Sequence, residues 1–96
     1  MGSRRRPQPL RLPAKLLRIR QSLDLTQEQM AGLLETRRSP VYPTHVSEFE
    51  RGLREPSLLA LLQYARLAGV STDVLIDDDL DLPRKLSNIS RQGIKR

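Results

Sequence analysis

Apolar residues recur every three or four positions along most of the chain, in stripes separated by Pro, Gly, Ser and Thr residues. The first stripe consists of Leu12, Leu16, Ile19 and Leu23. This period places side chains on one face of a helix, whereas a half-buried strand requires alternation with a period of two. No segment shows that alternation. The sequence therefore predicts an all-α fold.

The residues between the stripes predict where the first two helices begin. Pro13 suits the first turn of a helix that runs to about Ser22. Thr26 and Gln29 form a capping box, in which the Thr26 side chain caps free backbone N–H groups of the helix start and the Gln29 side chain turns back toward the backbone of Thr26. The second helix is therefore expected to begin there, and the polar, Pro-containing stretch 35–42 is expected to be a loop.

Three further helices are expected after this loop. Pro43 opens the third helix, and Gly52 is placed to end it in a left-handed conformation. The fourth begins at Pro56-Ser57 and stops at Gly69, and residues 71–73 cap a short fifth helix. The side chains expected to face inward are Met30, Ala31, Leu34, Val46, Phe49, Leu53, Leu58, Leu61, Leu62 and Ala65.

Length and composition narrow the class of protein. A chain of 96 residues forms one small hydrophobic core. It has no cysteine, which excludes disulfides and thiolate metal sites and favours a reducing cytoplasm. The longest apolar stretch is far shorter than the roughly 20 residues of a membrane span. The formal net charge of +6 favours an anionic partner, either nucleic acid or a membrane surface. We expect no membrane association, because no amphipathic anchor carries aromatic residues on its apolar face.

The positive charge lies mainly at the two ends of the chain. We expect residues 1–11 to form a disordered basic arm, residues 12–79 the folded domain and residues 80–96 a C-terminal tail. The arm contains three consecutive arginines, Arg4, Arg5 and Arg6. They suit contacts with phosphates or the minor groove, or a purely solubilising role, and the sequence leaves both open.

Four ordered motifs carry a family resemblance: residues 25–31 (LTQEQMA), 46–52 (VSEFERG), 55–58 (EPSL) and 67–71 (LAGVS). Together they resemble the Cro and phage-repressor type (Xre-like) helix-turn-helix domain. The resemblance spans about Leu16 to Ile76. It implies a compact five-helix repressor-like DNA-binding domain, often dimeric, whose third helix enters the major groove.

The chain departs from the family in the turn between the second and third helices. The family usually has a tight turn with Gly near the position of Glu35, whereas here about five extra residues intervene before Pro40, at little cost in loop-closure entropy. The insertion carries Arg37 and Arg38. We favour a contact of these two side chains with DNA phosphates over a merely solvated loop.

The resemblance also implies DNA-contacting residues. Gln27, at the start of the second helix, is expected to bind a phosphate, as are Arg51 and Arg54 at the end of the third. Pro43, Thr44 and Glu48 fall where the family contacts base edges, with His45 and Ser47 as further candidates because the long turn alters the register. Glu48 suits either acceptance from cytosine N4 or a solvent-facing position.

The family places an Arg of the first helix against a Glu of the third. The matching residues are Arg20 and Glu50, for which we predict a mostly buried ion pair.

No catalytic or metal site is predicted. Asp77, Asp79 and Asp81 resemble the start of a calcium loop, but Leu82 and Asn88 stand where Gly and Glu are required. With one histidine and no cysteine, no nucleophile lies beside a base in a recognisable pattern. We therefore expect neither an enzyme nor a cofactor.

Two functional hypotheses remain. The first is a bacterial or phage transcriptional regulator of repressor or antitoxin type, a homodimer that binds specific sequences in double-stranded DNA in the cytoplasm, at the nucleoid. The second is a protein-interaction module on a helix-turn-helix scaffold without specific DNA binding, which would use segment Val74–Leu82. The apolar residues of this segment are also the candidate dimer interface: Val74, Leu75, Ile76, Leu80 and Leu82.

Overall fold

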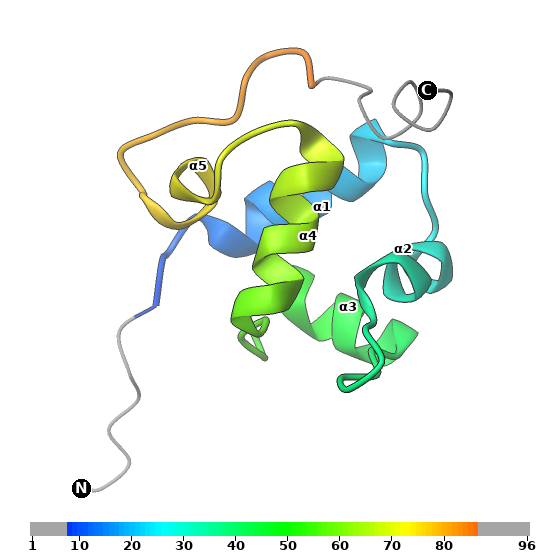
Figure 1. The fold of residues 1–96 in the computed structure, drawn as a ribbon. Helices are drawn as coiled ribbons and strands as arrows, with labels where there is room; N and C mark the ends of the chain where they lie inside the picture. The colour runs from blue at the N-terminus through cyan, green and yellow to red at the C-terminus, as the bar shows by residue number, and fades with distance from the viewer. Residues whose placement is uncertain (1–7, 87–96) are drawn as a thin grey trace, which may run out of the picture.

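The computed structural model describes residues 8–86, which form five α-helices (Figure 1). They are α1 (Leu12–Ser22), α2 (Gln27–Leu34), α3 (Pro43–Glu50), α4 (Leu58–Ala68) and α5 (Thr72–Ile76). Within residues 8–86 the only β pairing is an isolated bridge between Thr36 and Ser39. The prediction of an all-α, five-helix, repressor-like fold is confirmed.

The predicted capping residues define the helix ends. Thr26 Oγ1 accepts a hydrogen bond from the backbone N–H of Gln29 at 3.0 Å, and Gln29 Oε1 accepts one from the Thr26 N–H at 2.9 Å. Both bonds of the capping box before α2 are therefore present. Gly52 and Gly69, which follow α3 and α4, have φ angles of 76° and 74°, a left-handed conformation that disfavours residues with a Cβ. Ser71 is the N-cap residue of α5, although its side chain makes no capping hydrogen bond.

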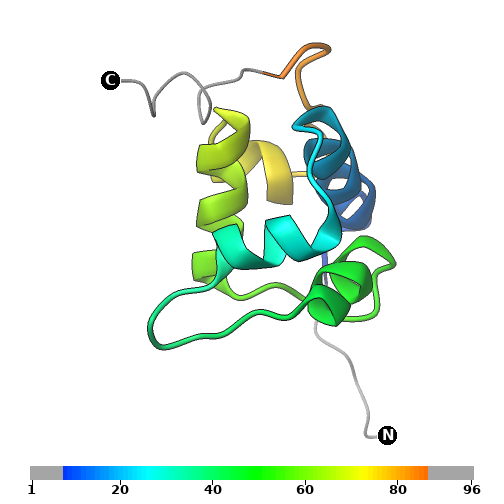
Figure 2. The ribbon, with the colours of Figure 1, turned by 90° about the vertical axis from the view of Figure 1, so that its right-hand side faces the viewer.

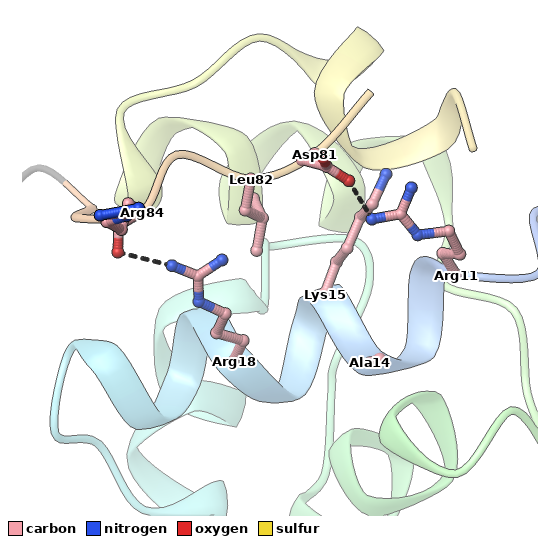
Figure 3. A pocket seen from close by; sticks show the side chains of 7 residues that line it. All are labelled: Arg11, Ala14, Lys15, Arg18, Asp81, Leu82 and Arg84. Atoms are coloured by element: carbon pink, nitrogen blue, oxygen red, sulfur yellow. Dashed lines mark hydrogen bonds and ion pairs between the residues drawn. The ribbon is translucent and has the colours of Figure 1, made fainter. Parts of the chain in front are cut away.

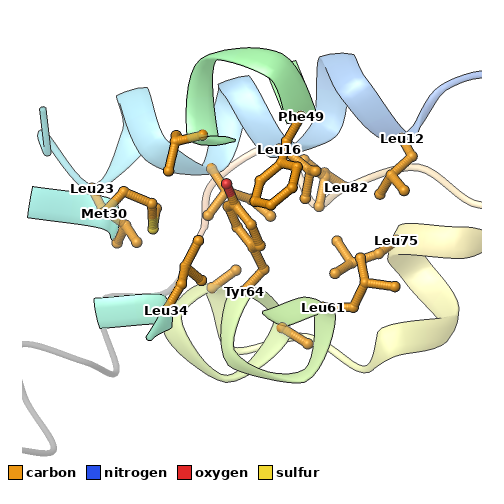
Figure 4. Close-up of a cluster of buried hydrophobic side chains, with 14 of the residues drawn as sticks. Leu12, Leu16, Leu23, Met30, Leu34, Phe49, Leu61, Tyr64, Leu75 and Leu82 are labelled. Atoms are coloured by element: carbon orange, nitrogen blue, oxygen red, sulfur yellow. The ribbon is translucent and has the colours of Figure 1, made fainter. Parts of the chain in front are cut away.

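The core lies between α1, α2, α3 and α4 and is closed by α5. All four residues of the first apolar stripe are buried, and Tyr64 of α4 is fully buried. Figure 4 shows the Tyr64 ring pointing into the middle of the cluster, with Leu34 on one side and Phe49 and Leu16 on the other. Burial raises the pKa of the Tyr64 hydroxyl well above its ordinary value.

Two side chains that were expected to face inward are exposed. Leu53 is 66% exposed because it lies beyond Gly52, where α3 has ended and its helical period no longer applies. Leu58 is 82% exposed. It is the first residue of α4, and a helical side chain leans toward the N-terminus of its helix, in this case past the edge of the core. The expectation that these two leucines form part of the core is wrong.

The chain after α5 returns along α1, and we call residues 77–86 the C-terminal strap (Figure 1). Leu82 and Leu86 of the strap are buried in the core, as is Leu75 of α5. The sequence predicts a tail over residues 80–96 and an apolar interface that includes Leu75 and Leu82. The latter expectation is wrong for these two side chains, because they already contact the core of their own domain.

Polar contacts hold the strap on α1. The ammonium of Lys15, only 4% exposed, donates to the backbone oxygens of Val74, Asp77 and Leu80 at 2.7, 3.0 and 2.8 Å. These three bonds use every donor of the ammonium and satisfy carbonyls at and beyond the end of α5. Lys15 therefore acts as a clamp between the first helix and the strap.

Asp78 of the strap binds the chain where it enters α1. Its carboxylate accepts hydrogen bonds from the backbone N–H groups of Leu10 and Arg11 at 2.9 and 3.0 Å. The Arg11 guanidinium in turn donates to the Asp78 carbonyl and pairs with Asp81. The acidic run that resembles a calcium loop thus includes two carboxylates, those of Asp78 and Asp81, that hold the start of α1.

Candidate nucleic-acid interface

Glu50 of α3 connects α3 to both preceding helices. Its carboxylate accepts from Arg20 Nε at 2.6 Å, from Arg20 Nη2 at 3.1 Å and from Gln27 Nε2 at 3.1 Å. The side chains of Arg20 and Glu50 are 16% and 4% exposed. The hydrogen bond to Glu50 raises the pKa of Arg20. The ion pair implied by the family resemblance is therefore present, and it holds α3 at a set position relative to α1 and the start of α2.

Gln27, the expected phosphate ligand, is the first residue of α2. Its side-chain amide is oriented by Glu50, which leaves the free backbone N–H groups of the helix start as the groups that can receive a phosphate oxygen.

The leading end of α3 presents the first of the expected base-contacting residues. Pro43 and Thr44 are exposed in the first turn. His45 is half-buried, and its Nδ1 accepts a hydrogen bond from the backbone N–H of Tyr42 at 3.2 Å. The rings of Tyr42 and His45 meet edge to face, with centroids 5.2 Å apart. His45 therefore caps the start of α3.

Two expected base contacts are paired with two expected phosphate contacts. Arg51 Nε donates to Ser47 Oγ at 3.2 Å. Arg54 Nε lies 2.6 Å from Glu48 Oε1, in an ion pair whose side chains are 49% and 33% exposed. Arg54 lowers the pKa of Glu48 through this hydrogen bond. The sequence predicts base contacts for Ser47 and Glu48 and phosphate contacts for Arg51 and Arg54. In the structure each arginine is oriented by its hydrogen bond to Ser47 or Glu48.

The inserted turn forms a small hairpin. The Thr36 N–H donates to the Ser39 carbonyl at 3.1 Å, and the Ser39 N–H donates to the Thr36 carbonyl at 3.2 Å. Arg37 and Arg38 are therefore the two residues at the tip, and both are exposed. Figure 2 shows this loop projecting beyond α2 on the side of the molecule that carries α3. The basic arm with Arg4, Arg5 and Arg6 lies outside the described residues.

Sequence reasoning missed the His45 cap and the Glu48–Arg54 pair. His45 stands three residues after Tyr42, where a capping box has Glu or Gln, which is a weak signal. Glu48 and Arg54 are separated by six residues and by the end of α3, so no helical spacing relates them. The burial of Lys15 had a clearer signal in the sequence, because helical spacing places Lys15 on the same apolar face as Leu12 and Leu16.

A compact five-helix domain in which Arg20 and Glu50 fix α3 beside α2 defines a helix-turn-helix domain. The profile of the helix-turn-helix family matches residues 16–75, and the chain belongs to this family, in its Cro and phage-repressor type. The family is one of DNA-binding regulators. No curated protein and no solved structure matches the chain.

Residues 8–86 contain neither a membrane span nor a metal-binding cluster. None of the helices in this range has the length and apolar character needed to span a bilayer. No group of three or more His, Cys, Asp or Glu residues in the same range is placed to hold a metal ion.

Proposed function

We propose that the protein is a bacterial or phage transcriptional regulator that binds a specific sequence in double-stranded DNA through α3. The observation that carries this proposal is the arrangement of α3 itself. The Arg20–Glu50 pair anchors its inner side, while Pro43 and Thr44 at its leading end are exposed. A rigid helix with a free leading end is the element that enters the major groove in this class of domain.

Bases and phosphates are contacted by different residues in this proposal. The base contacts come from Pro43, Thr44, His45, Ser47 and Glu48. Pro43 suits an apolar contact with a thymine methyl, and Glu48 accepts from cytosine N4. The phosphate contacts come from Gln27, Arg37, Arg38, Arg51 and Arg54, with Arg4, Arg5 and Arg6 following the backbone or minor groove.

We further propose a homodimer that binds two half-sites one helical turn apart, because one domain of this size contacts few base pairs. Of the apolar segment Val74–Leu82, Ile76 and Leu80 remain exposed, at 46% and 40%. Sedimentation of the chain alone and with its DNA site measures the stoichiometry, and a monomer in both cases contradicts the dimer. The proposed location is the cytoplasm, at the nucleoid, and the proposed activity is binding without catalysis.

The alternative, an interaction module without specific DNA binding, has less support in the folded domain. It relied on the apolar segment Val74–Leu82, of which Leu75 and Leu82 are buried. We therefore do not propose it, although it becomes the leading hypothesis if the chain does not select a DNA sequence.

Selection from random DNA duplexes, followed by affinity measurements, tests the proposed function. We expect one enriched, palindromic site. Thr44→Ala should lose about 1–3 kcal/mol of discrimination at one base pair while binding non-specific duplexes as before. Arg66→Ala, on the exposed side of α4, serves as the control and should retain the wild-type site. Failure to enrich any site contradicts sequence-specific binding. Unchanged discrimination in variants at Thr44, His45, Ser47 and Glu48 contradicts α3 as the element that reads the sequence.

A further inference from the structure

The C-terminal strap and α1 enclose a hollow that the proposed DNA contacts do not use. Figure 3 shows it between Arg11 and Arg18, above Ala14 of α1 and below the strap. Figures 1 and 2 both place the strap and α3 on opposite sides of α1. A ligand in this α1–strap hollow therefore does not compete with a DNA duplex held by α3.

The charges around the hollow are unbalanced. Four basic side chains, those of Arg11, Lys15, Arg18 and Arg84, line it together with a single carboxylate, that of Asp81. Asp81 is already paired with Arg11. Lys15 lies close enough to Asp78 and Asp81 for its charge to lower the pKa of both carboxylates. Arg18 and Arg84 have no carboxylate partner among the residues that line the hollow, so their combined field attracts an anion.

The hydrogen bonds of Lys15 and Arg18 do not involve a carboxylate. Lys15 donates only to backbone carbonyls. Arg18 Nη2 donates to the carbonyls of Pro83 and Arg84, both at 2.7 Å. A carbonyl satisfies a donor without neutralising a full charge. Among the described residues no partner engages the Nε and Nη1 donors of Arg18, which belong to a guanidinium that binds phosphates and carboxylates in a planar fork.

The base of the hollow is apolar. Ala14 is exposed and contributes only a methyl group, and the side chain of Leu82 points down from the strap (Figure 3). A concave surface with an apolar base and a few convergent charged groups is the usual form of a small-molecule site. Inorganic phosphate alone would leave this apolar base uncovered.

We propose that the α1–strap hollow binds a small organic anion. The guanidinium groups of Arg18 and Arg84 hold its phosphate or carboxylate group, and its apolar part covers Ala14 and Leu82. Because the strap and α1 each supply part of the site, the bound anion also ties the strap to the helix. The site is separate from the proposed DNA contacts, so it stands or fails independently of DNA binding.

Titration of the full chain with phenyl phosphate and with benzoate, followed by backbone amide chemical shifts, tests this proposal and distinguishes the two anionic groups. We expect saturable shifts at Ala14, Arg18, Leu82 and Arg84 with at least one of the two probes. Arg18→Gln should weaken that binding about tenfold, as expected for the loss of a hydrogen bond to a charged group. Arg66→Gln removes the same charge from the exposed side of α4 and should bind as the wild type does.

Ala14→Leu supplies a test that does not depend on the strap contacts of Arg18. It fills the base of the hollow at an exposed position without changing any charge, so we expect the same loss of binding with an unchanged melting temperature. Equal affinity of Ala14→Leu and the wild type would show that anions bind only to the general positive charge and would overturn the proposal. Shifts that do not saturate with either probe, or that spread over all basic residues, would overturn it as well.

Discussion

The guanidinium of Arg20 donates two hydrogen bonds to the carboxylate of Glu50, which lies 30 residues later in the chain. Arg20 also donates through Nη1 to the carbonyl of Leu25, in the turn before α2, at 2.9 Å. One side chain of α1 therefore positions both α3 and the turn that leads into α2. In the proposed function this pair sets the angle at which α3 meets DNA, although neither residue is proposed to contact DNA.

Removal of Glu50 should destabilise the domain strongly. Glu50→Ala leaves the Arg20 guanidinium largely buried without its counter-charge, which typically costs about 3–5 kcal/mol of the free energy of unfolding. Urea denaturation followed by circular dichroism measures this loss. Glu48→Ala is the matched control, because it removes an ion-paired carboxylate from the solvent-accessible side of the same helix, where water screens the pair, and should cost much less than Glu50→Ala. Equal losses for the two variants would contradict a special role of the buried pair.

The helices could be predicted from sequence because their signals are local. The capping box at Thr26 and Gln29, Pro43 at the start of α3 and the two left-handed glycines all act within one helical turn. The C-terminal strap could not be predicted in this way. Its contacts join residues such as Arg11 and Asp78 that lie 67 positions apart, and no periodicity relates two segments of irregular backbone.

Lys15 should matter more for stability than an exposed lysine does. Lys15→Met keeps a side chain of similar length to the aliphatic part of lysine. It removes the ammonium, which is the common hydrogen-bond donor to the carbonyls of Val74, Asp77 and Leu80. Each buried acceptor that is left without a partner costs about 1–3 kcal/mol, less where water reaches it. We expect a loss of several kcal/mol in the free energy of unfolding, measured by denaturant titration. Lys85→Met, at an exposed position of the strap, is the control, and a loss as small as that of the control would contradict the clamp.

Acid should release the strap before it unfolds the rest of the domain. Hydrogen bonds from the backbone N–H groups of Arg11 and Leu10 lower the pKa of Asp78, and a hydrogen bond from the Arg11 side chain lowers that of Asp81. A lowered pKa in the folded state means that the charged carboxylate stabilises the fold. This stabilisation is present above the unfolded-state pKa of about 3.9 and is lost as the pH falls through the folded-state pKa.

Asp78→Asn tests this pH dependence. Melting temperatures between about pH 2 and 6 should fall steeply with acidification in the wild type and less steeply in the variant, because the variant has no carboxylate to protonate at this position. Asp79→Asn, an exposed position in the same turn, should retain the wild-type slope. Identical slopes for the wild type and Asp78→Asn would show that the Asp78 carboxylate does not contribute to the stability of the fold.

The candidate DNA-contacting residues were partly predictable. The family resemblance placed Gln27 at the start of the second helix and Thr44 in the first turn of the third, because the motifs at or next to these positions include the cap and the buried side chains that fix the register. The partner of Glu48 was not predictable. It depends on where Arg54 lies after Gly52, and the path of the chain beyond a left-handed glycine is set by packing against other helices.

The hairpin arginines should contribute to DNA affinity without contributing to sequence preference. Replacement of both Arg37 and Arg38 by Gln should lower the slope of log K against log salt by about 0.9 for each phosphate that the variant no longer neutralises. The preferred sequence should stay the same, because phosphate contacts carry no direct base information. Binding isotherms at several salt concentrations measure the slope. An unchanged slope would indicate that the hairpin projects away from the duplex.

The pairing of Glu48 with Arg54 predicts that their roles in DNA binding are coupled. Arg54→Ala alone should weaken binding to all duplexes to a similar degree, since it removes a phosphate contact. Glu48→Ala alone should relax discrimination at one base pair by about 1–3 kcal/mol. It should also free Arg54 from the orientation that the 2.6 Å ion pair imposes, and so disturb the binding of Arg54 to phosphate as well.

The effects of the two substitutions should therefore not add. In a double-mutant cycle on the selected site, the Glu48→Ala/Arg54→Ala variant should differ from the sum of the single variants by about 0.5 kcal/mol or more, as for other residues in direct contact. Thr44→Ala combined with Arg54→Ala is the control, because Thr44 lies at the opposite end of α3 and its effect should add to that of Arg54→Ala. Additive effects of the Glu48 and Arg54 substitutions would show that the ion pair opens when the protein binds DNA, with each side chain then acting on its own.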